Sequence, residues 1–147
     1  MIEPARSPEV RKSDTLKLLA EEVDAWVSTA AADGTPYLMP LSFLWDGESL
    51  WLSTAATNPT SLNLQASGQV HLAIGHTRDV VLITGTAKQA APSPETGDAF
   101  ATKAGFDPRT LKNPYPFFQV TPHRIQCWRE VNEIKDRDVL RDGHWLV

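Results

Sequence analysis

The amino-acid sequence predicts a mainly β fold of the α+β class, arranged as a small antiparallel barrel or a curled sheet with short helices at its openings. Short runs of apolar and β-branched residues recur between residues 25 and 131, which is typical of strands. Asp-Gly dipeptides separate the first of these runs and supply the positive φ angles that tight hairpins need. Helical spacing is confined to brief segments. A sheet of many short strands protects its edges by closing on itself.

The first expected element is a short amphipathic helix near the N-terminus. Ser13 and Asp14 offer side-chain oxygens for its cap, and the spacing of Leu16, Leu19 and Val23 suits one helical face. Residues 1–14 are expected to form an N-terminal arm.

Five strands are expected next, and the first three should form an antiparallel meander. Asp33-Gly34 and Asp46-Gly47 provide the two turns of this meander. The expected strand ranges are Ala25 to Ala30, Tyr37 to Trp45, Ser49 to Thr54, Gln69 to Ile74 and Val80 to Lys88.

Two further helices are expected among the strands. Asn58-Pro59 is a typical helix start, so a short helix should follow the third strand. Ser93-Pro94-Glu95 opens another helix, which ends near Gly105. The last strands are expected at Phe117 to Val120 and Arg124 to Val131, followed by a hairpin or tail over residues 132–147.

The composition bounds the size, location and partners of the protein. At 147 residues the chain has room for one domain, residues 1–147. The longest apolar runs are only strand-sized, which excludes a membrane span, and the N-terminus lacks a secretion signal, so a cytoplasmic location is expected. A net charge of -4 argues against a nucleic-acid partner, although local groups can still hold one phosphate.

Residue spacing gives no support to metal or hydrolytic chemistry. Cys127 is the single cysteine, and the four histidines lack metal-ligand spacing, so we expect no metal site. Hydrolase elbows, phosphate-binding glycine loops and dinucleotide fingerprints are also missing from the sequence.

A polar strand-to-helix junction is the most informative candidate for ligand binding. Free amides at a helix N-terminus attract anions, and hydroxyl side chains surround this one, so it could hold a phosphate. The alternative is that the same groups only cap the helix and form a polar loop. The candidate residues are Ser53, Thr54, Ala55, Asn58, Thr60 and Ser61.

A second candidate is a cation at the end of the last long strand. Strict alternation puts Arg129 on the same face as Ile125, and an arginine on an apolar face needs an acceptor. That acceptor is a carboxylate such as Glu133 or Asp136 in a structural ion pair, or else a cofactor phosphate or a partner subunit.

Two nearby side chains also have two interpretations each. Trp128 is either a packing residue at an interface or a ring that stacks on a cofactor. Arg78 is either a local ion pair in a turn or a cation on the ligand side.

Several segments, taken in order, resemble the pyridoxamine 5'-phosphate oxidase-like proteins. Residues 25–36 resemble their opening hairpin, and residues 39–45 and 50–55 resemble their second and third strands. Asn63-Leu64 lies in a segment like their short helix, and Gly85-Thr86-Ala87 ends a strand like their fifth. The segment Trp128-Arg129-Glu130 looks like a C-terminal signature of one branch, the flavin and deazaflavin oxidoreductases.

The resemblance implies a six-stranded antiparallel split β-barrel that forms a homodimer with cofactor sites at the subunit interface. In such proteins the isoalloxazine ring lies against the second strand, and the third strand with the helix after it holds the phosphate. The implied cofactor-binding residues are Met39, Pro40, Leu41, Ser42, Ser53, Thr54, Ala55, Asn58, Thr60, Ser61, Asn63, Arg78, Trp128 and Arg129.

The resemblance also implies an oxidoreductase in which bound FMN exchanges hydride or electrons with a small organic substrate. Many members carry Lys or Arg in the first turn of the phosphate helix, where this chain has residues 59–62, Pro-Thr-Ser-Leu. One alternative is therefore a reductase that uses the deazaflavin coenzyme F-420. The other is a non-catalytic protein that binds or stores a flavin or haem.

Overall fold

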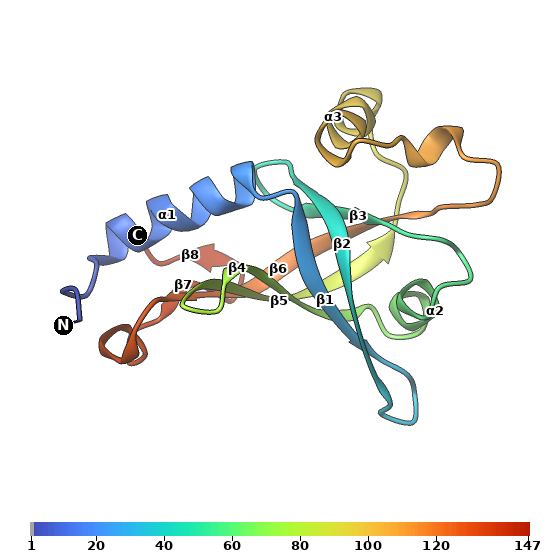
Figure 1. Ribbon diagram of the computed structural model, residues 1–147. Helices are drawn as coiled ribbons and strands as arrows, with labels where there is room; N and C mark the ends of the chain where they lie inside the picture. Colours follow the sequence, from blue (N-terminus) through green and yellow to red (C-terminus); the bar gives the residue numbers. More distant parts are fainter. Residues whose placement is uncertain (1) are drawn as a thin grey trace.

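The fold is an antiparallel barrel extended by a small hairpin, seen in a computed structural model that describes residues 2–147 (Figure 1). The strand order β3-β2-β1-β4-β5-β6-β7-β8 is closed by an additional β3–β6 pairing, so the first six strands form a barrel. This confirms the predicted six-stranded antiparallel barrel. The strands are β1 Asp24–Ala30, β2 Pro36–Trp45, β3 Leu50–Ser53, β4 Gln69–His76, β5 Asp79–Gln89, β6 Phe117–Trp128, β7 Asp138–Arg141 and β8 His144–Trp145.

Alternation along β1, β2, β4 and β5 separates the core from the outer surface. In β1, Ala25, Val27 and Thr29 are buried, whereas Trp26 between them is exposed. The predicted meander is confirmed, because β2 pairs with both β1 and β3. Its turns contain Gly34 and Gly47 with φ of 89° and 101°, values that favour glycine.

In the part of the chain that the structure describes, three α-helices flank the barrel: α1 Pro8–Glu21, α2 Pro59–Ala66 and α3 Pro94–Ala104. The predicted start of α1 at Ser13 is wrong, because Ser7 caps the helix and Pro8 occupies its first turn. The predicted caps Asn58 and Ser93 are confirmed. No helix within residues 2–147 has the length and apolar character to cross a membrane.

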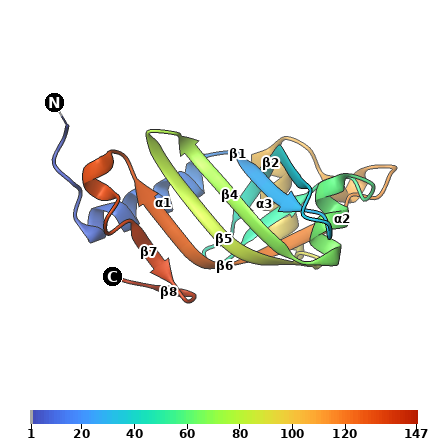
Figure 2. The ribbon, with the colours of Figure 1, turned by 90° about the horizontal axis from the view of Figure 1, so that it is seen from below.

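The first two helices lie at opposite ends of the barrel (Figures 1 and 2). Leu19 of α1 and Leu64 of α2 are both buried in the same apolar core. Each helix therefore closes one opening of the barrel with an apolar side chain.

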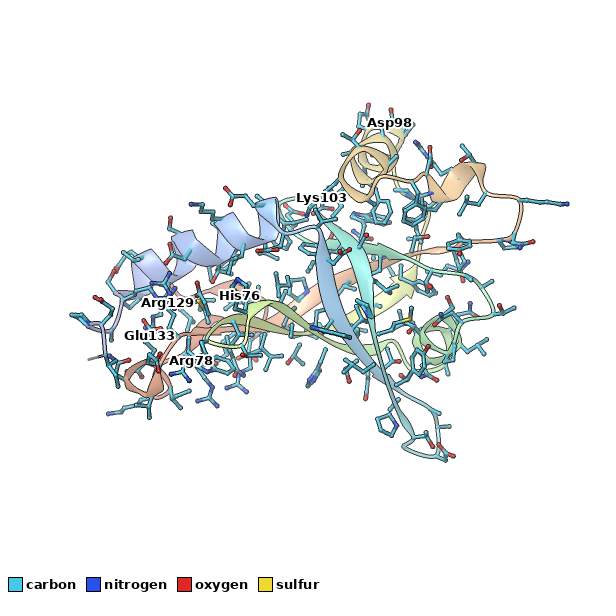
Figure 3. All side chains as sticks on the ribbon, in the orientation of Figure 1. His76, Arg78, Asp98, Lys103, Arg129 and Glu133 are labelled. Atoms are coloured by element: carbon cyan, nitrogen blue, oxygen red, sulfur yellow. The ribbon has the colours of Figure 1, made fainter. Side chains whose placement is uncertain are left out.

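The third helix packs on the outside of β2 and β3 through a second apolar cluster. Phe100 of α3 lies edge to face against Phe117, which in turn contacts Trp51. Lys103 of α3 places its Nζ 3.9 Å from the centre of the Phe43 ring, and burial lowers its pKa (Figure 3). This helix and the 3-10 turn η1 Pro108–Thr110 position the long loop that leads to β6.

One long strand, β6, closes the barrel where we predicted two separate strands. The β5–β6 register shifts between Thr84 and Gly85, and Pro122 lies opposite Gly85. A Cβ at Gly85 would lie 2.7 Å from the carbonyl oxygen of Thr121, so the strands approach more closely here than any side chain would allow. The strand then ends at Trp128, and the 3-10 turn η2 Val131–Glu133 leads to the β7–β8 hairpin.

Candidate cofactor site

The β3–α2 junction is held together by the polar groups that we predicted to bind a phosphate. Asn58 Oδ1 accepts a hydrogen bond of 2.9 Å from the Thr60 N–H. Ser61 Oγ donates to the Ala55 carbonyl at 2.8 Å, and Ser53 Oγ donates to the Pro116 carbonyl at 3.0 Å. These bonds fix the start of α2 against β3 and the loop before β6. The hydroxyls of Ser53 and Ser61 are therefore already engaged within the chain.

Thr60 has a hydroxyl of a different kind within this junction. Its side chain is fully buried, yet its Oγ1 has no hydrogen-bond partner within residues 2–147. Thr54 is also buried, and Asn63 Nδ2 donates to Thr29 Oγ1 at 3.1 Å, which ties α2 to β1. The fully buried hydroxyl of Thr60 is thus uncommitted beside the N-terminus of an uncharged helix.

The predicted ring-binding stretch of β2 presents its side chains to two different faces. Leu41 is buried and Met39 is half-buried, and both pack on the core. Pro40 and Ser42 alternate with them on the outer face, where Ser42 Oγ donates to Asp24 Oδ1 at 2.8 Å. A ligand on the outer face would therefore meet Pro40, Ser42 and the β2 backbone.

An exposed apolar surface, formed by Trp26, Leu38, Pro40 and Ala73, surrounds this stretch. Trp26 is 52% exposed and Leu38 is 60% exposed, although both lie in the middle of the sheet. In the strand register Trp26 is opposite both Pro40 and Ala73. The three line a hollow of about 260 Å³ together with Glu22, Asp24, Ala25, Gly75 and His76. We call this region the outer apolar surface.

Arg78, Trp128 and Arg129, the three remaining residues that were predicted to bind the cofactor, lie far from α2, at the other end of the β4–β5 hairpin. Arg78 pairs with Glu130 at 2.8 Å, and Arg129 Nε lies 3.1 Å from Asp79 Oδ1. Trp128 is half-buried, and the guanidinium of Arg137 lies over its ring at 5.7 Å. Within one chain, α2 and these side chains do not form a single site.

The surroundings of Arg78 and Arg129 are balanced in charge. Figure 3 shows both near Glu133 at the α1 end of the barrel. Arg6, Arg78 and Arg129 line a cavity there of about 450 Å³ with three carboxylates, those of Glu3, Glu130 and Glu133. Arg129 does not point into the core as predicted, because β6 ends one residue before it and its side chain is 46% exposed. The ion-pair interpretation describes Arg129 in this chain.

Glu133 is the carboxylate at the centre of this cluster. Both of its oxygens accept hydrogen bonds from Arg6, at 2.7 and 2.9 Å, and its Oε1 also accepts from the Arg129 N–H. The hydrogen bonds from Arg6 lower the pKa of Glu133 to about 2. Glu133 thus holds the backbone of Arg129 rather than its guanidinium.

Sequence reasoning missed two features of the structure. The exposure of Trp26 was not anticipated, although its alternation with Ala25 and Val27 was a readable signal. A basic pocket near β7 was also missed, because its side chains come from segments that are far apart in the sequence. Within residues 2–147 no three His, Cys, Asp or Glu side chains group as metal ligands would.

The closed barrel and its α2 junction define the class of split-barrel proteins. The chain belongs to the pyridoxamine 5'-phosphate oxidase family, whose family model matches residues 14–129. A search of curated protein sequences returned no match.

Solved structures share this fold at low sequence identity. An F420 reductase has a TM-score of 0.59 and 21% identity, covering 74% of this chain and 93% of its own. An FAD-binding protein from Mesorhizobium loti has a TM-score of 0.63 and 16% identity, with coverages of 78% and 89%. HutZ, the haem storage protein from Vibrio cholerae, has a TM-score of 0.64 and 12% identity, with coverages of 91% and 99%. These likenesses show the fold alone.

Proposed function

We propose that this chain is an FMN-binding oxidoreductase that acts on a small organic substrate as a homodimer. The observation that carries the proposal is the outer apolar surface, where a hollow beside Pro40 adjoins the β2 stretch expected to carry the flavin ring. A flat ring and a second subunit would together cover Trp26 and Leu38, which the single chain leaves half exposed or more. Family membership supports the same reading.

The phosphate of FMN would lie at the N-terminus of α2. The helix dipole and the hydroxyl of Thr60 favour an anion there, and α2 contains no acidic residue to oppose it. In this arrangement Thr60 gains the partner that it lacks in the chain alone. The residues present therefore fit a phosphate held by hydrogen bonds and the helix dipole, without an ion pair.

The residues around the ring would orient the cofactor and exclude water. Bound flavin supplies the hydride or electron transfer, while Trp26 and Pro40 provide apolar contact and Ser42 provides a hydroxyl beside the β2 backbone. Asp24 holds Ser42 in place through its 2.8 Å hydrogen bond. No side chain of this group needs to form a covalent bond with the substrate.

A deazaflavin-dependent reductase is the second candidate, and one observation favours it. The first turn of α2 contains no Lys or Arg to pair with a phosphate. A cofactor that is held mainly by contacts outside this helix would therefore lose less affinity than FMN from the missing ion pair. The F420 reductase that shares this fold is consistent with that reading. A non-catalytic storage role, as in the name of the haem storage protein HutZ, is the third candidate.

A parallel titration distinguishes these candidates. Cofactor-free protein is titrated with FMN, F-420 and haem, and light scattering measures the mass of each complex. Saturable FMN binding to a dimer, followed by reduction of the flavin with NADH or NADPH, is the expected result. Tighter binding of F-420 would replace the first candidate with the second, and haem binding without turnover would replace both. Binding of none would overturn the proposal.

A further inference from the structure

A cluster of cations lies at the end of the barrel that α1 covers, away from α2. Here α1 and β7 lie side by side (Figures 1 and 2). Together with β6 they line a cavity of about 370 Å³ with five cationic and two anionic side chains, which sum to +3, and with the chain-terminal Val147. We call the five cations the basic corner: Arg11, Arg124, Lys135, Arg137 and Arg141.

This local charge is opposite in sign to that of the whole chain, which is -4. The neighbouring cavity at Arg78 and Arg129 has three cations and three carboxylates, so its charges cancel. The basic corner is therefore not a general property of this end of the barrel. Concentrating like charges in one cavity costs free energy unless an anion offsets it.

The strand register brings two of these cations directly opposite each other. Arg124 of β6 and Arg141 of β7 are Cα partners, a placement that is unfavourable for like charges. Asp138 lies between them, 2.9 Å from Arg124 Nε and 2.9 Å from Arg141 Nη2. One carboxylate thus serves two guanidinium groups, which leaves one positive charge without compensation.

The other three cations have no carboxylate partner within residues 2–147. Arg137 donates to the Gln126 side chain and the Ile134 carbonyl, which are neutral acceptors. Lys135 is exposed and makes no ion pair in the part of the chain that the structure describes. Their charge remains available to a bound anion.

Arg11 is the most informative of the three because it is buried. Its side chain belongs to a residue only 5% exposed, and one nitrogen donates to the Asp136 carbonyl. Its Nε has no hydrogen-bond partner within residues 2–147. A buried guanidinium with an unused donor is costly, and Arg11 lines the cavity, so an oxyanion bound there would offset its positive charge.

We infer that the basic corner is a binding site for a small polyanion that carries two linked phosphoryl groups. Guanidinium groups match phosphoryl oxygens with paired hydrogen bonds, and two phosphoryl groups can reach cations on both sides of the cavity. The site draws on α1, β6 and β7, and it shares no residue with the β3–α2 junction. It is therefore independent of the proposed flavin site.

The test is a calorimetric titration of flavin-free protein with inorganic pyrophosphate. We expect saturable binding, and we expect Arg141→Gln to weaken it about tenfold or more because a charge-assisted contact is lost. The matched control is Arg109→Gln, which removes the same charge from an exposed residue paired with Asp98 and Asp107 near α3. The control should change the affinity by less than about twofold.

Three results would overturn the site itself, and a fourth would overturn its preference for two linked phosphoryl groups. The first is an absence of saturation up to roughly 10 mM pyrophosphate, which corresponds to binding weaker than about 3 kcal/mol. The second is equal weakening by both variants, which would indicate diffuse attraction rather than a site. The third is weakening by Thr60→Val, which would place the anion at α2. Orthophosphate serves as a comparison, and binding as tight as that of pyrophosphate would remove the claim for two phosphoryl groups.

Discussion

Two buried polar side chains, Thr60 and Glu133, differ in what surrounds them. Glu133 accepts hydrogen bonds from Arg6 and from the Arg129 backbone, so its burial is fully compensated. Thr60 has a buried hydroxyl with no partner within residues 2–147. The first residue is therefore expected to stabilise the fold, and the second is expected to serve a ligand.

Glu133→Gln should lower the free energy of unfolding by about 2–3 kcal/mol at pH 7, because it removes the buried carboxylate that accepts two hydrogen bonds from the Arg6 guanidinium and leaves that cation with its 3.0 Å pair to Asp14. Urea unfolding measures the loss. Glu130→Gln is the matched control, since its partner Arg78 is 78% exposed and such a pair contributes about 0.5 kcal/mol or less. Equal losses in the two variants would contradict the assignment.

The same pair predicts how stability depends on pH. The pKa of Glu133 falls from 4.5 to about 2 on folding, mainly through its hydrogen bonds from Arg6. Because the folded pKa is the lower one, the stabilisation is complete above about pH 5 and is lost as the pH falls toward 2. Unfolding measured between pH 6 and 3 should therefore show a smaller decline in Glu133→Gln than in the unaltered protein.

Thr60→Val tests the candidate phosphate site through two readouts. Removing an unpartnered buried hydroxyl should raise the stability of the cofactor-free protein by about 1 kcal/mol, and it should weaken FMN binding about tenfold. Ser61→Ala is the control, because its hydroxyl bonds the Ala55 carbonyl and its loss should lower stability instead. Unchanged FMN affinity in Thr60→Val would remove this hydroxyl from the site.

At the scale of elements, helix caps and turns could be predicted from neighbouring residues, whereas features that depend on strand pairing could not. The caps Asn58 and Ser93 and the Asp-Gly turns are encoded within a few residues, and all of them were found. Ser7-Pro8 carries the same kind of signal and begins α1, upstream of the expected cap at Ser13. Pro122 lies between the two strands that the sequence predicts, because proline usually interrupts a strand. In the structure β6 continues through Pro122, since the register with β5 shifts beside it, and this shift is visible only in the paired strands.

Gly85→Ala should weaken the pairing of β5 with β6. Its Cβ would lie 2.7 Å from the Thr121 carbonyl oxygen and 2.8 Å from a Val120 methyl group, so backbone would have to move. We expect the free energy of unfolding to fall by about 1–3 kcal/mol. Lys88→Ala, at an exposed position of the same strand, should change it by less than about 0.5 kcal/mol. Thermal unfolding of both variants provides the comparison.

At the scale of the whole molecule, the candidate site could be predicted only in part. The residue types at the β3–α2 junction were readable, but the acceptors of Ser53 lie more than sixty residues away in sequence. The distance of Arg78 and Arg129 from α2 follows from the lengths of the strands and their order in the sheet. The alternation of residues along the sequence does not predict that order. The basic corner required the register of β6 and β7.

Leu38→Glu tests the assembly that the outer apolar surface implies. Leu38 is 60% exposed in the single chain, so a carboxylate there is compatible with the fold but not with a covered interface. We expect the dimer to become a monomer and FMN affinity to fall about tenfold or more. Val131→Glu is the control, because Val131 is 73% exposed in η2 and lies outside this surface. Light scattering reads the mass, and an intact Leu38→Glu dimer would place the interface elsewhere.

The pairing of β6 with both β3 and β5 has a consequence for synthesis on the ribosome. β6 is the partner of both β3 and β5, and residues 117–128 emerge after both of those strands. Until they emerge, the nascent chain has two open sheet edges at once, and such edges recruit other strands. We therefore expect stalled chains that end before residue 117 to aggregate or to bind chaperones. Chains that extend past residue 128 and clear the exit tunnel should become protease-resistant in a single step.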